Sequence, residues 1–338
     1  MQTKKILVVS TTSFFGGGES FIANVLQKIE GKLYFVVASD ELFNSIKSEF
    51  KFSFHNKSFI KRLNFVNELI QREKIDVVIL NGGNSIYFAP FINSSKCVIY
   101  RHTTLKSYYN LVKRICVAFL QNIAFCYAKK IIHVSKYSSK EQFLVTNRRK
   151  VIHNGVAIQP CEKIKNNIPV RVKFLFLGRT EKAKGVDIIV SAFIKLKKEG
   201  YNLDVVGCGE MDSYLRSLDN SNICYHGFDK EVAKYYKNSS VLISLPKAEA
   251  FGLTLVEAMS YGCPVISCAT GGIPEIVESG YNGYIINRDV NSLIQSIKHI
   301  SESPDRLYQM SMNAYNTASS KFNVERTIEN INKVINEL

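Results

Sequence analysis

The sequence has no apolar run of the roughly 20 residues that a membrane-spanning helix needs. The longest candidate runs from Ile115 to Ala128 and is interrupted by Gln121 and Asn122. The apolar stretch near the N-terminus is too short for a signal peptide, so we expect it to form the first strand of a sheet. These absences favour a cytoplasmic protein, with peripheral attachment to the inner face of a membrane as the remaining option.

Cysteine motifs for metal binding are also lacking. None of the eight cysteines forms a C-x-x-C pair, and none has a histidine at zinc-finger spacing. Most lie in apolar runs, where a free cysteine behaves as a small hydrophobic residue. The turn Gly207-Cys208-Gly209 lacks the third glycine of a dinucleotide fingerprint, so the sequence indicates neither NAD nor a structural metal.

Acidic residues are few, with 29 Asp and Glu against 44 Lys and Arg, which gives a formal net charge of +15. Such a charge favours an anionic partner, which leaves nucleic acid, an anionic membrane and an anionic substrate as classes. No zinc-finger, RNA-recognition or helix-turn-helix signature is present, so we expect no nucleic acid partner.

What the chain does contain is a regular alternation of short apolar runs and helical segments, starting with an expected strand over 4–10 and a helix over 19–29. Further helices are expected over 40–49 and 137–144. Alternation of this kind predicts parallel sheets covered by helices on both faces. A length of 338 residues accommodates two such domains. The polar run over 160–169 is the expected linker between them.

The stretch from Arg101 to Lys150 is strongly basic, with eleven Lys and Arg residues and a single acid, Glu141. Apolar and aromatic residues are interleaved with these cations between Tyr108 and Tyr127. A helix of this composition can lie on an anionic bilayer. A core helix with solvated lysines explains the same pattern, and the sequence does not decide between the two.

The segment 244–285 carries the clearest chemistry. It predicts a strand end, a loop with Glu249, a helix that begins after Gly252 and bears Glu257, a short strand, and a second helix that begins at Pro274. Helices that begin just after parallel strands present free N–H groups and a positive dipole end to phosphate. Two carboxylates in such a place suggest sugar hydroxyl groups as their partners.

Two further loops add polar groups at the same kind of position. Arg179 and Lys184 precede an expected helix, and a guanidinium and an ammonium so placed can converge on one diphosphate. Gly17 and Gly18 give the backbone freedom to approach a ligand at the first helix, although a plain turn explains them too. His102 directly follows an expected strand.

Segment 244–285 resembles the retaining nucleotide-sugar glycosyltransferases of family 4, of the GT-B type. It has their Glu-x-Phe-Gly-Leu, Glu-Ala-Met, Gly-x-Pro-Val-Ile and Gly-Gly-x-Pro-Glu elements, with seven residues between Glu249 and Glu257. Asn154-Gly155-Val156 is similar to another family element. The match is looser at His153, Ala157 and Cys208, where family members commonly carry Pro, Asp and Asp.

The resemblance implies an α/β, GT-B fold with two Rossmann-like parallel-sheet domains facing a central cleft. Residues 1–160 would form the acceptor-side domain and residues 161–320 the nucleotide-sugar domain. A C-terminal helix over 321–338 can cross back to the first domain, as in similar proteins.

The resemblance also implies roles for single residues. Arg179 and Lys184 would hold the donor diphosphate, Glu257 the ribose hydroxyls, Glu249 the donor sugar or diphosphate, and His102 the donor sugar or the acceptor. Further donor-binding positions are Gly17, Gly18, Gly178, Gly209, Phe251, Gly252 and Leu253. No metal or cofactor is expected, since the cations and the helix end stabilise the leaving diphosphate.

The expected activity is transfer of a hexosyl or N-acetylhexosaminyl group, with retained anomeric configuration, from a UDP- or GDP-sugar. The acceptor would be a surface polysaccharide, a lipopolysaccharide or another lipid-linked glycan. Two alternatives stay open: a nucleotide-sugar epimerase or sugar phosphorylase on the same fold, and a non-catalytic binding protein.

Overall fold

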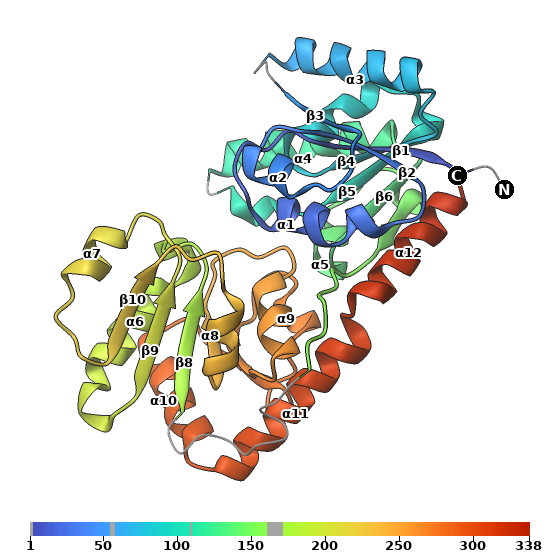
Figure 1. The fold of residues 1–338 in the computed structure, drawn as a ribbon. Helices are drawn as coiled ribbons and strands as arrows, with labels where there is room; N and C mark the ends of the chain where they lie inside the picture. The colour runs from blue at the N-terminus through green and yellow to red at the C-terminus, as the bar shows by residue number, and fades with distance from the viewer. Residues whose placement is uncertain (1–2, 55–57, 109, 161–171) are drawn as a thin grey trace. The chain divides into compact units, whose positions relative to one another are not determined.

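The computed structural model describes residues 3–54, 58–108, 110–160 and 172–338. The chain forms two compact units, unit 1 from Met1–Gly155 with Val324–Leu338, and unit 2 from Val156–Asn323. The linker and domain boundary expected near residue 160 lie, apart from Pro160 itself, outside the described residues. Both units are α/β, as the alternation of apolar runs predicts (Figure 1).

Unit 1 is built on a seven-stranded parallel sheet in the order β3-β2-β1-β4-β5-β6-β7. Its strands are β1 (Lys5–Ser10), β2 (Lys32–Val37), β3 (Lys51–Ser53), β4 (Val77–Asn81), β5 (Cys97–Arg101), β6 (Lys130–His133) and β7 (Arg149–Val151). The central strands are mostly apolar and almost entirely buried because helices cover both faces of the sheet.

The helices of unit 1 are α1 (Gly17–Asn24), α2 (Asp40–Ser45), α3 (Phe59–Glu73), α4 (Leu111–Cys126), α5 (Lys136–Lys140) and α12 (Val324–Asn336). Helix α12 comes from the far end of the chain and is fixed to unit 1 by side-chain bonds to backbone. Lys4 Nζ donates to the carbonyl of Ile335 at 2.8 Å, and Thr327 Oγ1 donates to the carbonyl of His153 at 3.0 Å.

Unit 2 has a six-stranded parallel sheet in the order β10-β9-β8-β11-β12-β13. Its strands are β8 (Lys173–Leu177), β9 (Asn202–Val206), β10 (Ile223–Gly227), β11 (Val241–Ser244), β12 (Val265–Cys268) and β13 (Gly283–Ile286). Its helices are α6 (Val186–Lys195), α7 (Asp212–Ser217), α8 (Ala233–Asn238), α9 (Leu253–Ser260), α10 (Val290–Ser301) and α11 (Pro304–Lys321).

Each sheet reverses its strand order once, between β1 and β4 in unit 1 and between β8 and β11 in unit 2. At such a switch point the loops that follow the two strands diverge to opposite faces of the sheet. The crevice that they leave is where open α/β sheets bind ligands. The positions of these reversals therefore select the loops that matter for function.

The helix expected to begin at Pro274 does not form. The structure has only a single 3₁₀ turn over Ile273–Glu275. The buried side chain of Asn282 bonds to backbone groups that a longer helix would use within itself. Its Nδ2 donates to the carbonyl of Ile276, and its Oδ1 accepts from the amide of Glu278. Tertiary hydrogen bonding thus overrides a favourable helix start.

Helices expected over 40–49 and 137–144 are also shorter than predicted, ending at Ser45 and Lys140. In the second case the buried side chain of Gln142 donates to the carbonyls of Leu144 and Val145 and stops the helix. Among the residues that the structure describes, no helix combines the length and the apolar character needed to cross a bilayer.

Candidate functional site

The switch point of unit 2 brings the predicted cation and carboxylate together. Lys184 lies in the loop after β8 and Glu249 in the loop after β11, and Lys184 Nζ is 2.8 Å from Glu249 Oε2. Both side chains are about a quarter exposed. The pair therefore connects the two loops at the switch point between β8 and β11, and both side chains remain accessible to a ligand.

Arg179 follows the same strand as Lys184 but is much more open to solvent. Its side chain is 66% exposed, and its Nη1 is 2.6 Å from Glu181 Oε1. An exposed pair of this kind contributes little to stability, about 0–1 kcal/mol. Breaking the Arg179–Glu181 pair therefore costs little, so the guanidinium can pair with another anion in place of Glu181.

Close backbone packing holds the β8 and β11 loops against each other. Gly185, with φ +85°, is the N-cap of α6, and a Cβ at this position would lie 2.4 Å from the carbonyl oxygen of Leu245. Gly271, with φ +59°, is even closer to the loop after β11, because a Cβ at this position would collide with the carbonyl oxygen of Glu249. The loop after β12 thus fixes the backbone that carries the Glu249 carboxylate.

Arg288 is a part of this site that the sequence did not indicate. It follows β13, and its Nε donates to the carbonyl of Leu245 at 2.8 Å while its Nη2 donates to the carbonyl of Lys182 at 2.7 Å. One side chain therefore ties together the two loops that carry Lys184 and Glu249. No motif could have revealed it, because its partners are backbone carbonyls.

Helix α9 begins directly after the second loop and has no side-chain cap. Its N-cap is Gly252, with φ +114°, so the first N–H groups of the helix gain no hydrogen bond from a capping side chain. Phe251 is buried and packs against Phe322 with ring centroids 5.6 Å apart. Phe251 thus anchors the turn, and Leu253 occupies the first helical position, where a backbone amide has no partner within the helix.

Glu257 lies one turn into α9 and carries an unusual proton affinity. Its Oε2 accepts a hydrogen bond of 2.9 Å from the hydroxyl of Tyr236, a buried residue of α8. Burial raises the pKa of the Glu257 carboxyl to about 7, against the lowering effect of the Tyr236 hydrogen bond. Tyr236 is the second site residue that the sequence did not indicate.

The neighbouring loops contain Gly178 and Gly209, both predicted to bind the donor, and the backbones of these loops pack closely together. Gly209 follows β9, and a Cβ there would lie 3.0 Å from the backbone of Thr180. Its amide donates to Asp212 Oδ1 at 2.8 Å, and the Thr180 hydroxyl donates to the same oxygen. Gly178, with φ +151°, lies where β8 ends and its carbonyl oxygen faces the α-carbon of Gly207.

Unit 1 has its own cluster at the switch point between β1 and β4. His102 follows β5, and its Nε2 is 2.9 Å from the Oδ1 of Asn81 at the end of β4. Asn81 Nδ2 in turn donates to the carbonyl of Gly18 at 3.1 Å, at the start of α1. Gly17 lies in the same turn, with open space around its α-carbon.

The network fixes the protonation of His102. Because the Asn81 amide nitrogen faces the Gly18 carbonyl, its oxygen faces the imidazole, which must donate through Nε2–H. Burial lowers the pKa of His102 to about 3, and its ring stacks on Tyr100 with centroids 4.7 Å apart. His102 is therefore neutral at physiological pH and offers Nδ1 as a hydrogen-bond acceptor.

Among the residues that the structure describes, one group of side chains elsewhere in unit 2 could hold a metal ion. Ligand atoms of Asp204, Cys224 and His226 lie within 4.8 Å of one another on the adjacent strands β9 and β10. His226 Nε2 and Asp204 Oδ1 already form a pair at 2.6 Å. This group lies at the edge of the sheet, away from the switch-point loops, and takes no part in the site.

Part of the chain is similar to a known protein family. Residues 161–317 match the family of glycosyl transferases group 1. An uncharacterized glycosyltransferase of Methanocaldococcus jannaschii is 31% identical over 218 residues, 62% of this chain and 60% of the relative. The chain spans about half the length of the curated relatives it matches, between 44% and 60% for four of them.

Solved structures resemble the whole chain. HepE of Anabaena, solved in complex with UDP and glucose, is similar with a TM-score of 0.83 at 20% identity, covering 100% of both chains. The lipopolysaccharide outer core galactosyltransferase WaaB is similar with a TM-score of 0.70 at 18% identity, covering 99% of this chain and 100% of WaaB. The two units therefore have the fold of GT-B glycosyltransferases, and residues 161–317 are similar to the glycosyl transferases group 1 family.

Proposed function

We propose that this protein is a retaining glycosyltransferase that moves a hexosyl or N-acetylhexosaminyl group from a UDP- or GDP-sugar. The acceptor is a surface polysaccharide or a glycolipid such as lipopolysaccharide, at the inner face of a membrane. The observation that carries the proposal is the Lys184–Glu249 pair across the switch point of unit 2. Structures of HepE hold UDP and UDP-glucose, which supports a nucleotide-sugar donor.

The charges of unit 2 suit the bond that breaks. Cleavage of a sugar–phosphate bond leaves negative charge on the departing diphosphate. Arg179, Lys184 and the uncapped N-terminus of α9 supply positive groups for that charge, so the step needs no metal. An oxygen of the donor phosphate then accepts the proton of the incoming hydroxyl on the same face, which retains the anomeric configuration.

The carboxylates have separate tasks. Glu257, held by Tyr236, accepts hydrogen bonds from the ribose hydroxyls in its ionised form. Glu249 releases Lys184 to the diphosphate and accepts from a hydroxyl of the donor sugar. In unit 1, the Nδ1 of neutral His102 accepts from a hydroxyl of the donor sugar or the acceptor.

Donor binding tests the proposal directly. A thermal-shift screen against UDP- and GDP-sugars should find a ligand that raises the melting temperature, because a ligand that binds only the folded state stabilises it by mass action. Arg179→Ala and Lys184→Ala should each lower the affinity for that ligand by roughly ten- to a hundredfold, because each variant loses one or two charge-assisted hydrogen bonds.

Lys182→Ala is the matched control, because Lys182 is exposed in the same 3₁₀ turn as Lys184. It should leave donor affinity unchanged. Release of free nucleotide only when a glycan acceptor is added identifies transfer, and the anomeric proton coupling of the product reports retention. Unchanged donor affinity in both Arg179→Ala and Lys184→Ala would refute the site.

A further inference from the structure

Strands β9 and β10 lie side by side at one edge of the unit 2 sheet (Figure 1). Asp204 of β9 pairs in register with Cys224 of β10. Side chains alternate between the two faces of a strand, and Ile223 and Tyr225, the neighbours of Cys224, pack against the hydrophobic core. Asp204 and Cys224 therefore lie next to each other on the opposite face of this edge.

An irregularity in β10 brings a third polar side chain to the same place. The pairing of β10 with β9 shifts between Tyr225 and Gly227, so His226 is an extra residue at this point. Its Nε2 lies 2.6 Å from Asp204 Oδ1. The imidazole also packs against Tyr235 of α8, with ring centroids 4.9 Å apart. The contact with Tyr235 restricts the ring, which therefore stays directed toward Asp204.

The three side chains offer a set of donor atoms that suits zinc. Zn²⁺ accepts imidazole nitrogen, thiolate sulfur and carboxylate oxygen, whereas Mg²⁺ and Ca²⁺ prefer oxygen alone. Ligand atoms around a tetrahedral zinc are about 3.5 Å apart, because the bonds to the metal are about 2.0–2.3 Å long. The separations in this group run from 2.6 Å to at most 4.8 Å, so small side-chain rotations would bring the atoms to zinc geometry.

A simple histidine–aspartate pair accounts for only two of these groups. The side chains of His226 and Asp204 are 28% and 32% exposed, and a pair with that access to water contributes little to stability. A cation can therefore separate the pair at low cost. Cys224 is exposed beside it, so an ion can enter this group from solvent.

We propose that Asp204, Cys224 and His226 bind Zn²⁺ between β9 and β10. On binding, the Cys224 thiol releases its proton to solvent and its sulfur bonds to the metal. The Nε2 lone pair of neutral His226 and a carboxylate oxygen of Asp204 supply the other two protein ligands, and water takes the fourth position. The metal joins the edge strand β10 to its neighbour and stabilises this end of the sheet. The site does not depend on the proposed sugar transfer.

Chelator competition on the full chain tests the site. After treatment with EDTA, the wild type should take up one equivalent of Zn²⁺ from a chromophoric chelator. Cys224→Ser and His226→Ala should each lower the Zn²⁺ affinity at least about tenfold, because even the loss of a group that only orients a ligand has an effect of this size. Zn²⁺ should raise the melting temperature of the wild type but not of either variant. Both positions are exposed, so the fold should persist, as circular dichroism would verify.

Cobalt identifies the ligands directly. Co²⁺ in this site should give a thiolate-to-cobalt charge-transfer band in the near ultraviolet, and Cys224→Ser should abolish it. The matched controls are Cys116→Ser, at an exposed cysteine of α4, and His299→Ala, at an exposed histidine that lies 3.5 Å from Glu302. Both controls should bind Zn²⁺ and Co²⁺ as the wild type does. Absence of metal uptake by the wild type, equal losses in control and test variants, or a cobalt band that persists in Cys224→Ser would each overturn the proposal.

Discussion

The protonation of Glu257 offers a quantitative test of the unit 2 site. Its folded-state pKa is about 7, compared with an ordinary value of 4.5, because burial disfavours the ionised carboxylate. Replacement by glutamine keeps the shape and an acceptor oxygen for Tyr236 but removes the charge. The stability of the wild type and of Glu257→Gln should therefore respond differently to pH.

The sign and size follow from linkage. Below pH 4.5 the Glu257 carboxyl is protonated in the folded and the unfolded protein, so its burial does not lower the free energy of unfolding. Between pH 4.5 and 7 the unfolded chain releases the proton while the folded chain retains it, so the free energy of unfolding falls as pH rises. At 1.36 kcal/mol for each pKa unit, the wild type loses about 3 kcal/mol across this window that Glu257→Gln does not lose.

Urea unfolding at several pH values from 4 to 8 measures this difference. The chain has no tryptophan, so circular dichroism is the suitable signal. Other groups titrate in both proteins, and subtracting the two curves removes their contribution. A difference between wild type and Glu257→Gln that stays constant within about 0.5 kcal/mol over that range would refute the raised pKa of Glu257.

The same charge governs the ligand. A carboxylate accepts two ribose hydroxyls better than a carboxylic acid does, so donor affinity of the wild type should rise from pH 6 to pH 8. The affinity of Glu257→Gln should be weaker and independent of pH in that range. Calorimetric titration with the donor found by thermal shift would show either result.

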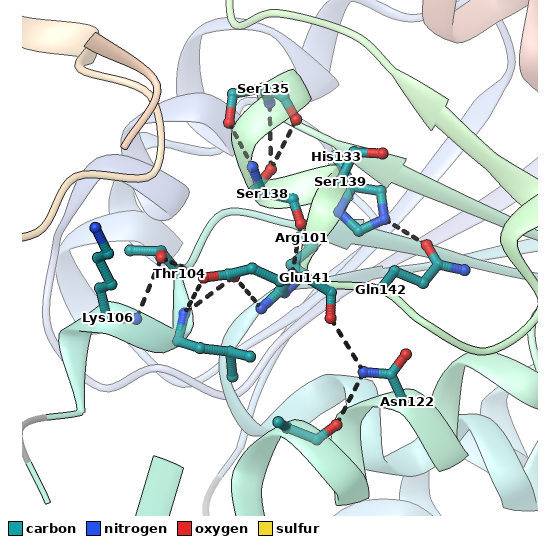
Figure 2. Close-up of polar contacts among 12 residues, drawn as sticks. Arg101, Thr104, Lys106, Asn122, His133, Ser135, Ser138, Ser139, Glu141 and Gln142 are labelled. Atoms are coloured by element: carbon teal, nitrogen blue, oxygen red, sulfur yellow. Dashed lines mark hydrogen bonds and ion pairs between the residues drawn. The ribbon is translucent and has the colours of Figure 1, made fainter. Parts of the chain in front are cut away.

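Three further predictions concern the scaffold. Glu141→Ala leaves Arg101 buried without its carboxylate partner (Figure 2) and should lower the free energy of unfolding in urea by about 3–5 kcal/mol. As a control, Lys333→Ala removes an exposed pair with Glu329 and should lower it by less than about 0.5 kcal/mol. Gly271→Ala should cost more than about 2 kcal/mol and weaken donor binding, because its Cβ would displace the Glu249 carbonyl; Gly280→Ala, with φ +83° but open space, should cost only about 1. His102→Ala should slow transfer in a nucleotide-release assay yet leave the UDP affinity within about twofold; a large loss of UDP affinity would move His102 to the nucleotide.

Much of the fold could be predicted because it depends on local patterns. Apolar runs that alternate with helical segments predict parallel sheets, and the carboxyl ends of parallel strands meet at one edge. That geometry places the loops of Lys184 and Glu249 next to each other, although the two residues are 65 positions apart in the chain. The edge strands Lys51–Ser53 and Arg149–Val151 were missed because three residues carry too little pattern.

The remaining site residues depend on how elements rotate against each other. Tyr235 and Tyr236 are adjacent in the sequence, yet one bonds to Asp229 and the other to Glu257. Only the packing of α8 against its neighbours decides which of them faces the carboxyl. The orientation of α4 is set in the same way, by the contacts of Asn122 with the backbone of the following loop.

Two arginines show how burial separates structure from function. Arg101 ends β5 and Arg179 follows β8, and each is paired with a nearby glutamate. Arg101 is 1% exposed, so releasing Glu141 would leave an uncompensated buried charge at a cost of several kcal/mol. Arg179 is 66% exposed, so water replaces Glu181 at almost no cost. A diphosphate could therefore replace Glu181 as the partner of Arg179, but it could not replace Glu141 as the partner of Arg101. Both arginines lie at the carboxyl ends of strands of their sheets.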